Sequence, residues 1–249
     1  MTIPTFLPYY VLLGTAGIIT AVLIGLNRAL EQAHWPVKRR KSTVGIAAAV
    51  LALWLAAAAA LAALGTFQAG ADTMPTIQYA IALPILIGGL LIWRSETVKH
   101  LIEAVPQSWL VGLQLYRALG VIFLILYATG RLPGLFAWPA GVGDILVGVL
   151  APVVAIAYAR APRLNGDLVA AWNWFGIGDL VIAVATGFIT APSLLQPFMV
   201  EPANHLVTLF PLALIPTFLV PLSILLHIAS LTKLRRTVPN RQVTSAQPA

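Results

Sequence analysis

Long apolar stretches alternate with short polar segments along the whole chain. Each stretch is close to the ~20 residues that an α-helix needs to cross a bilayer. The pattern therefore predicts an all-α integral membrane protein, a single bundle of seven transmembrane helices. Their predicted bounds are about 7–26, 44–67, 77–93, 110–129, 141–159, 168–190 and 206–231.

Three parts of the chain differ from a regular membrane-spanning helix. Residues 95–105 place apolar side chains at helical spacing with Lys99, His100 and Glu103 between them, which predicts an amphipathic helix on the inner membrane surface. The last apolar stretch contains Pro211, Pro216 and Pro221, so we expect that helix to be bent or locally unwound. Residues 232–249 are rich in Ser, Thr, Pro and Gln and predict a disordered cytoplasmic tail.

Composition and charge support a membrane protein and set its orientation. Hydrophobic residues make up 59% of the chain and charged residues only 9%, against about 25% charged residues in soluble domains. The predicted inner segments hold 13 of the 15 Lys and Arg residues, which places the N-terminus outside and the C-terminus in the cytoplasm. No basic stripe with interleaved aromatic residues accompanies the net charge of +7, so the expected partner is the lipid bilayer and not nucleic acid. The alanine-rich helices and compact loops favour a bacterial cytoplasmic (inner) membrane. No sequence pattern specifies an oligomeric state.

Three charged residues fall inside predicted helices, where a charge is costly unless it is paired or functional. Helix rise places Arg117 about 4 Å to the cytoplasmic side of the midplane, Asp179 near it, and Asp144 about 9 Å to the outer side. Arg117 and Asp179 are therefore expected to pair. Gln114 and Asn173 lie below these two residues and would line a polar path that opens inward. This cluster is the candidate binding site for a small polar solute or ion, although an ion pair that only fixes helix packing is an equal alternative.

Both aspartates end the same short pattern, Gly141-Val142-Gly143-Asp144 and Gly176-Ile177-Gly178-Asp179. Gly-x-Gly-Asp in a membrane helix resembles the signature of the intramembrane aspartyl proteases, and Pro211-Leu212-Ala213-Leu214 loosely resembles their Pro-Ala-Leu element. The resemblance implies that Asp144 and Asp179 would be catalytic and would share a proton. The alternative is that the glycines let two helices cross closely beside a hydrogen-bonded aspartate. The predicted difference in depth of about 9 Å argues against a shared proton.

No cofactor or metal site is predicted. His205 and His227 lie near opposite ends of the last predicted helix, about 33 Å apart, and lone histidines there are expected to be interfacial anchors. No phosphate-binding loop is present, and the sequence favours a protein that is not an enzyme, with the aspartyl protease left open as an alternative. The first hypothesis is a permease-like or small-solute-binding protein. The alternatives are the aspartyl protease and a non-catalytic membrane assembly or sensory partner.

Overall fold

The structure is a computed structural model that describes residues 3–70, 72–194, 196–197 and 199–237. Those residues form helices and connecting turns, without a strand among them. The elements in chain order are α1 (Leu7–Gln32), α2 (Val37–Ala63), α3 (Ile77–Arg94), α4 (Glu96–Ala104), α5 (Gln107–Gly112), η1 (Leu113–Gly120), α6 (Val121–Ala128), α7 (Gly134–Arg160), α8 (Gly166–Thr190), η2 (Leu206–Thr208), η3 (Ile215–Leu219) and α9 (Val220–Thr237).

Within the described ranges, seven helical segments are long and apolar enough to cross a membrane, as predicted. This is the architecture of a multi-pass membrane protein. Segments α5, η1 and α6 together form the fourth span, and η3 with α9 forms the seventh. Several predicted bounds were wrong: the helices α1 and α2 leave only residues 33–36 between them, and α7 begins at Gly134, seven residues before the predicted start.

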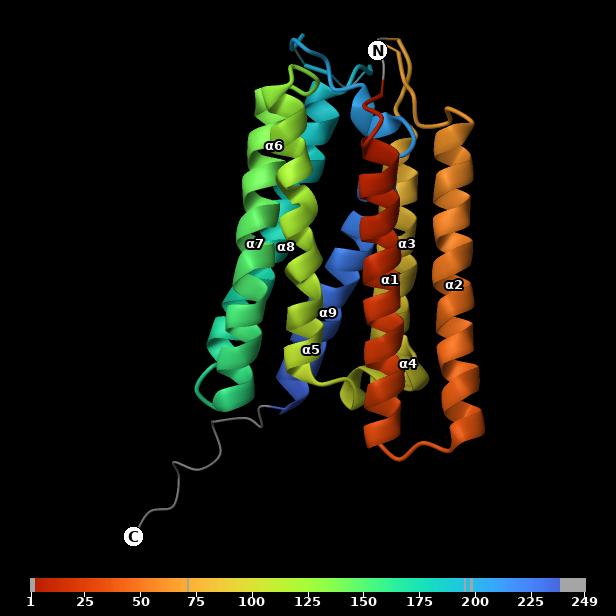
Figure 1. The fold of residues 1–249 in the computed structure, drawn as a ribbon, viewed down its shortest axis with the longest axis vertical. Coiled ribbons are helices and arrows are strands. Elements are labelled where there is room, and N and C mark those ends of the chain that lie inside the picture. Colours follow the sequence, from red (N-terminus) through yellow and green to blue (C-terminus); the bar gives the residue numbers. More distant parts are fainter. Residues whose placement is uncertain (1–2, 71, 195, 198, 238–249) are drawn as a thin grey trace.

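The seventh span is the centre of the bundle. Figure 1 shows α9 crossing between a group formed by α5 to α8 and a group formed by α1 to α3. It packs against α8 and α5 on one side and against α3 on the other. In the most apolar stretch of the seventh span 56% of the residues are buried, whereas in the corresponding stretch of α2 only 6% are buried. Polar residues on α9 are therefore shielded from lipid by the other helices, and those on α2 are not.

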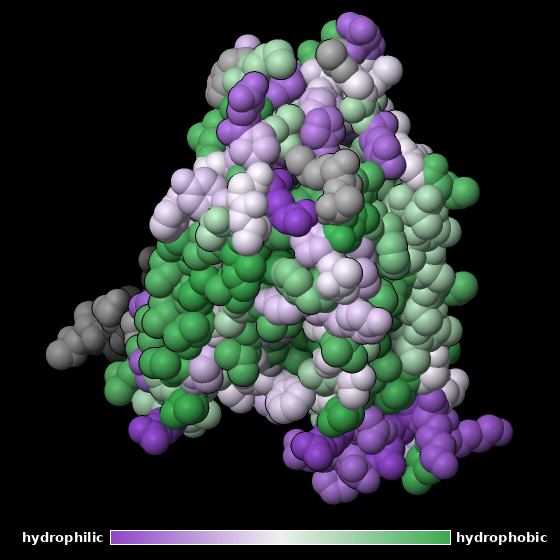
Figure 2. Space-filling model, turned by 45° about the horizontal axis from the view of Figure 1, so that its top comes forward, coloured by the Kyte–Doolittle hydropathy of each residue, from purple (hydrophilic) through white to green (hydrophobic). Residues whose placement is uncertain are grey.

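The outer surface of the bundle is apolar. Leu13, Leu53 and Leu86 are examples of large side chains that are more than half exposed. Figure 2 shows a broad hydrophobic band across one face, with hydrophilic residues gathered at its two ends. Such a surface matches hydrocarbon between two aqueous layers, because lipid tails and not water would cover the band.

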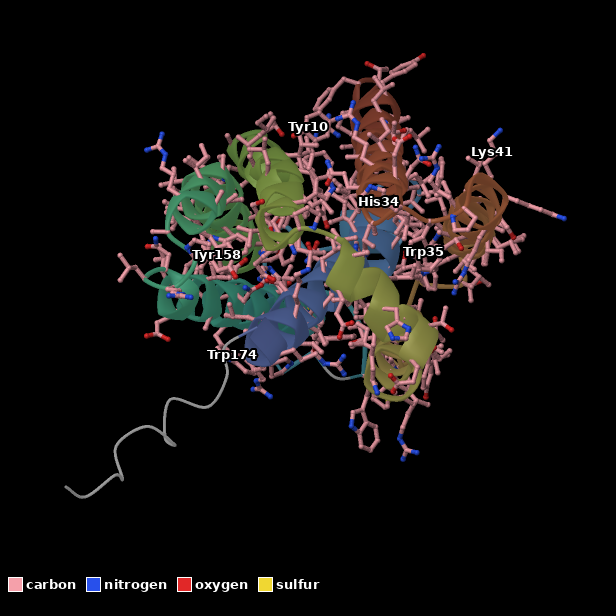
Figure 3. All side chains as sticks on the ribbon, turned by 90° about the horizontal axis from the view of Figure 1, so that it is seen from below. Tyr10, His34, Trp35, Lys41, Tyr158 and Trp174 are labelled. Carbon is pink, nitrogen blue, oxygen red and sulfur yellow. The ribbon has the colours of Figure 1, made fainter. Side chains whose placement is uncertain are left out.

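The short helix α4 confirms the amphipathic helix predicted at 95–105. Ser95 caps its first turn by accepting a hydrogen bond from the backbone N–H of Val98 (3.3 Å). Lys233 of α9 donates to the carbonyls of Ile102, Glu103 and Val105 at the C-terminal end of α4 (3.3, 2.6 and 2.7 Å). Seen from below, α4 lies across this end of the bundle (Figure 3), so the end of α9 positions it.

The length of α9 corrects the predicted start of the disordered tail. Helix α9 continues to Thr237, so residues 232–237 are helical and not part of a disordered segment. Residues 238–249, which were also assigned to the tail, lie outside the described residues.

The proline-rich start of the seventh span is irregular, which confirms the expected bend. Residues 206–214 form a short 3-10 helix and turns, and η3 is a π-helix. Two carbonyls of η3 accept hydrogen bonds from other helices: Thr217 from Trp54 Nε1 (3.2 Å) and Leu219 from the Tyr116 hydroxyl (2.9 Å). Non-helical backbone is tolerated inside a membrane when neighbouring side chains satisfy its polar groups in this way.

The fold yields a prediction about orientation. The described N-terminal residues and Thr237 lie at opposite ends of the bundle (Figure 1), and the basic residues gather at the end that holds Thr237. We expect a reporter fused to the C-terminus to be cytoplasmic, because basic flanks are retained inside. A second reporter inserted in the turn 129–133 should lie on the opposite side. Two reporters on the same side would contradict the path of the chain.

Candidate functional site

Arg117 is the buried centre of the polar residues in this bundle. It lies on η1 and is 2% exposed. Its Nε and Nη2 each contact Oδ1 of Asp144 at 2.7 Å, and Nη2 also contacts Oδ2 of Asp179. Its Nη1 donates to the carbonyl of Gly176 (3.1 Å) and contacts Nε2 of His227 (3.3 Å). Arg117 thus makes four hydrogen bonds and one further ion-pair contact, which offset part of the cost of burying it.

The predicted contact between Arg117 and Asp179 is confirmed, but the predicted depth of Asp144 was wrong. Both carboxylates contact the same nitrogen, so the bonding oxygens are no more than about 6 Å apart. The error came from the start of α7, since the helix accommodates Pro139 and begins at Gly134. Asp144 then lies ten residues into the helix, about 15 Å from the end at Gly134, which is half of a ~30 Å span.

The glycines of the two Gly-x-Gly-Asp segments make room for this cluster. A Cβ atom on Gly143 of α7 would overlap the Asp179 carboxylate of α8. A Cβ atom on Gly176 would come within 2.5 Å of the His227 ring and 3.2 Å of Arg117 Nη1. In contrast, Gly178 has no such neighbour within 4 Å. Close packing beside a hydrogen-bonded aspartate therefore accounts for the first glycine of one segment and the second glycine of the other.

A chain of polar side chains continues from Arg117 toward the end of the bundle that holds Thr237. His227 Nδ1 is 2.8 Å from the Asn173 side-chain oxygen, and Asn173 Nδ2 donates to the Ser230 hydroxyl (2.9 Å). Gln107 Nε2 donates to the same hydroxyl (2.6 Å). All of these side chains are buried. Asn173 does lie below Asp179 as predicted, but it bonds to other polar side chains and has no direct contact with the guanidinium.

His227 was misread as an interfacial anchor. It is fully buried between Arg117 and Asn173, because the helical end of the seventh span extends well beyond it. Its neighbours on the sequence carried the missing signal: Ser223, His227 and Ser230 are spaced four and three residues apart and share one face of α9. That face is directed into the bundle.

Gln114 lies on the same face of η1 as Arg117, as predicted, because a 3-10 helix has three residues per turn. Its side chain bonds to α9 and not to the charged cluster. Gln114 Nε2 donates to the Ser223 carbonyl (3.0 Å), and the Ser223 hydroxyl donates to Gln114 Oε1 (2.8 Å). The Tyr116 hydroxyl also contacts Ser223 Oγ (2.6 Å). These bonds fix η1, and with it Arg117, against the central helix.

The hydrogen bonds define the protonation state of His227. Arginine only donates, so Nε2 of His227 is the acceptor, and Nδ1 carries the hydrogen that Asn173 accepts. His227 is therefore the neutral tautomer. One guanidinium then stands against the two carboxylates of Asp144 and Asp179, and with both ionised the cluster carries a net charge of −1.

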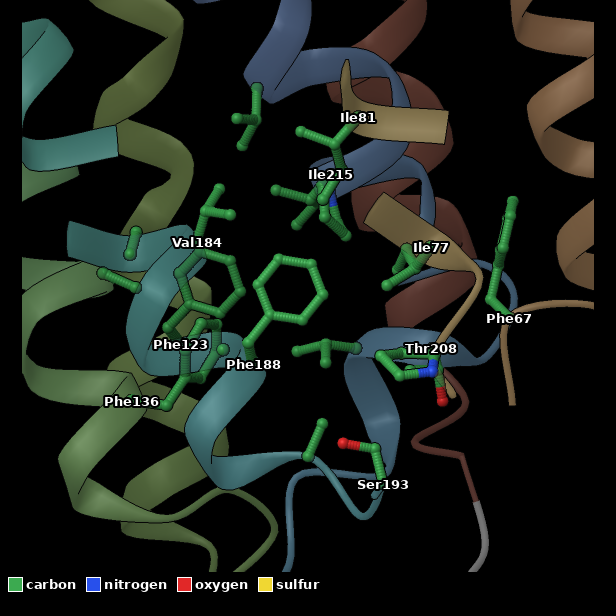
Figure 4. Close-up of a pocket in the computed structure, with 18 of the residues that line it drawn as sticks. Phe67, Ile77, Ile81, Phe123, Phe136, Val184, Phe188, Ser193, Thr208 and Ile215 are labelled. Carbon is green, nitrogen blue, oxygen red and sulfur yellow. The ribbon is translucent and has the colours of Figure 1, made fainter. Parts of the chain in front are cut away.

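Asp144 is the carboxylate at which this cluster meets empty space. A cavity of about 70 Å³ extends from loop residues such as Pro75 and Pro192 to Asp144. Its walls are almost entirely apolar, and Figure 4 shows Phe123, Phe136 and Phe188 around it. A second cavity of about 40 Å³ is lined by residues that include Arg117 and Asp144. Asp179 does not line either of the two.

Seven helices long and apolar enough to cross a membrane, around a buried arginine and two aspartates, are compatible with a polytopic membrane protein that has a charged centre. The family described as a domain of unknown function (DUF8737) matches residues 74–235, which is more than half of the chain, so the chain belongs to this family. The match covers α3 to α8 and nearly all of α9, including Arg117, Asp144 and Asp179. Comparisons with curated proteins and with solved structures give no match.

The glycine contacts predict a difference between two chemically identical changes. Gly143→Ala should lower the free energy of unfolding by about 2 kcal/mol, the usual cost of overpacking, because the new methyl group displaces the Asp179 carboxylate. Gly178→Ala should leave it nearly unchanged, because that position has no neighbour within 4 Å. Thermal unfolding of the purified proteins in the same detergent measures both. Equal losses would contradict the assigned packing.

The contacts of the ion cluster predict that substitutions of Arg117 and Asp179 will destabilise the protein to different extents. Arg117→Gln should be the most damaging change, by about 3–5 kcal/mol, because it leaves two buried carboxylates facing each other. Asp179→Asn should cost less, since Asp144 still neutralises the guanidinium.

The double variant Arg117→Gln/Asp179→Asn provides the control. It should lose less stability than the sum of the two single losses, because residues in one network are coupled. Simple addition of the single effects in denaturation experiments would show that the two side chains do not interact.

Proposed function

We propose that this chain is a permease-like membrane protein that binds a small solute at Asp144. The observation that carries the proposal is that Asp144 belongs to a buried ion cluster and also lines two cavities. A concave apolar site with a few converging polar groups is the usual form of a small-molecule site. An ionisable residue inside a membrane bundle is a functional candidate on physical grounds.

The bonding of Asp144 supports a role in binding. Both contacts from Arg117 fall on Oδ1, and Oδ2 has no hydrogen-bond partner within the described part of the chain. An acceptor oxygen at a cavity wall is available to a ligand. Arg117 holds the carboxylate in place through two contacts, so the site is preorganised.

The irregular start of the seventh span supports a transport role. Both cavities are lined by Ile215 and Val220. Ile215 is the first residue of the π-helix η3, and Val220 follows its last residue. In membrane transporters, interrupted helices commonly form the binding site and supply the moving part. A change in the helical geometry of η3 would alter the walls around Asp144 directly.

The remaining residues of the predicted site have supporting roles in this proposal. Asp179 and Arg117 supply the fixed charges behind Asp144. Gln114 holds η1 against α9 through Ser223, and Asn173 holds His227 against Arg117.

The aspartyl protease is the second candidate, and the convergence of Asp144 and Asp179 favours it. Arg117 weighs against it, because each carboxylate has a direct contact with the cation, which favours the ionised form of both over a shared proton. Cleavage of a membrane-spanning peptide that disappears in both Asp144→Ala and Asp179→Ala would replace our proposal with this one.

Identification of a bound solute tests the proposed function. Protein purified in a mild detergent and analysed by native mass spectrometry should carry a small co-purified molecule. Asp144→Asn should reduce its occupancy at least about tenfold, which corresponds to 1.4 kcal/mol of lost binding energy.

A matched variant separates this effect from general damage. Asp72→Asn makes the same chemical change on an exposed loop and should retain the molecule. Equal occupancy in the native protein and in the Asp144→Asn variant would contradict a solute site at Asp144. The thermal stability of each variant should be measured in parallel, because Asp179 still pairs with Arg117 in the Asp144→Asn variant.

A further inference from the structure

The charges and walls of the Asp144 site define a class of ligand, an inference that rests on the proposed function. We propose that the site takes a monovalent organic cation with an apolar or aromatic body. The cationic group would lie at Asp144, and the body would fill the cavity that leads to it.

The first support is the charge of the cluster. Arg117 balances only one of the two carboxylates, and His227 adds no charge in the tautomer that its hydrogen bonds require. An uncompensated negative charge in a membrane interior is costly, so a positive ligand is favoured over a neutral or negative one. Asp144 is the carboxylate that the ligand can reach, since it lines the cavities and Asp179 does not.

The second support is the wall of the larger cavity. Phe123 lines both cavities together with Asp144, and its ring packs edge-to-face on Phe136 with centroids 5.2 Å apart. Figure 4 shows these rings and Phe188 facing the same space. Aromatic faces attract cations as well as apolar groups. Ser193 and Thr208 are the lining residues with hydroxyl groups, at the end of the cavity nearest the loops.

The composition of the site disfavours two other classes of ligand. A divalent metal ion needs several oxygen ligands, and Asp144 is the one carboxylate among the residues described as lining the cavities. An anion would have to bind beside two carboxylates, with a guanidinium whose donors already have partners. A single positive charge on an apolar frame matches what remains.

A matched set of three probes tests the ligand class. Benzyltrimethylammonium is a permanent organic cation, neopentylbenzene is its neutral isostere, and phenylmethanesulfonate is an anion with the same ring. Each is titrated at matched free concentration into the full chain in lipid nanodiscs, and the Kd is obtained from the shift in thermal unfolding.

We expect the cation to bind at least about tenfold more tightly than the neutral isostere, and the anion to give no shift. Asp144→Asn should weaken binding of the cation at least about tenfold, whereas Asp72→Asn should leave the Kd unchanged. Equal binding of the isostere, stronger binding of the anion, or no binding of the cation would each overturn the ligand class.

These outcomes are separable from failure of the proposed function. If a neutral or anionic molecule binds or co-purifies in a way that depends on Asp144, the solute site stands and the cation assignment fails. If the cation binds equally to the native protein and to Asp144→Asn, the site is elsewhere and both proposals fail.

Discussion

The structure depends on the bonding of one guanidinium inside the membrane. Arg117 contacts partners from α7, α8 and α9 through all three of its nitrogen atoms. An unpaired arginine there would be very costly, so each of these helices is held where its acceptor is needed. The requirement is mutual, because Asp144 and Asp179 are themselves costly without the cation.

Small residues decide how closely the helices can approach that guanidinium. Gly143 and Gly176 each occupy a place where a methyl group would meet a member of the cluster. The Gly-x-Gly-Asp pattern therefore has a packing cause in this chain that does not require catalysis. The same pattern brings two carboxylates together, which explains how one short motif suits both a protease and a binding site.

The surroundings of the cluster differ on its two sides. Toward the end of the bundle that holds Thr237, His227, Asn173 and Ser230 bond to one another in sequence. Toward the other end, aromatic and aliphatic walls enclose a cavity that stops at Asp144. The irregular backbone of η3 borders that cavity. The cluster therefore has a hydrogen-bonded support on one side and a hollow bordered by an irregular helix on the other.

The sequence alone determined the number of spans and the pairing of Arg117 with Asp179. Both follow from distance along a helix, because a bilayer admits only fully hydrogen-bonded segments of sufficient length. The tertiary structure decided the depth of Asp144, which follows from the start of α7, and the burial of His227, which depends on the face that α9 turns inward. It also decided the cavity, whose walls come from residues far apart in the chain. Hydropathy records which segments are apolar but neither where each helix begins nor which neighbour a residue faces, and the chemistry of this site depends on both.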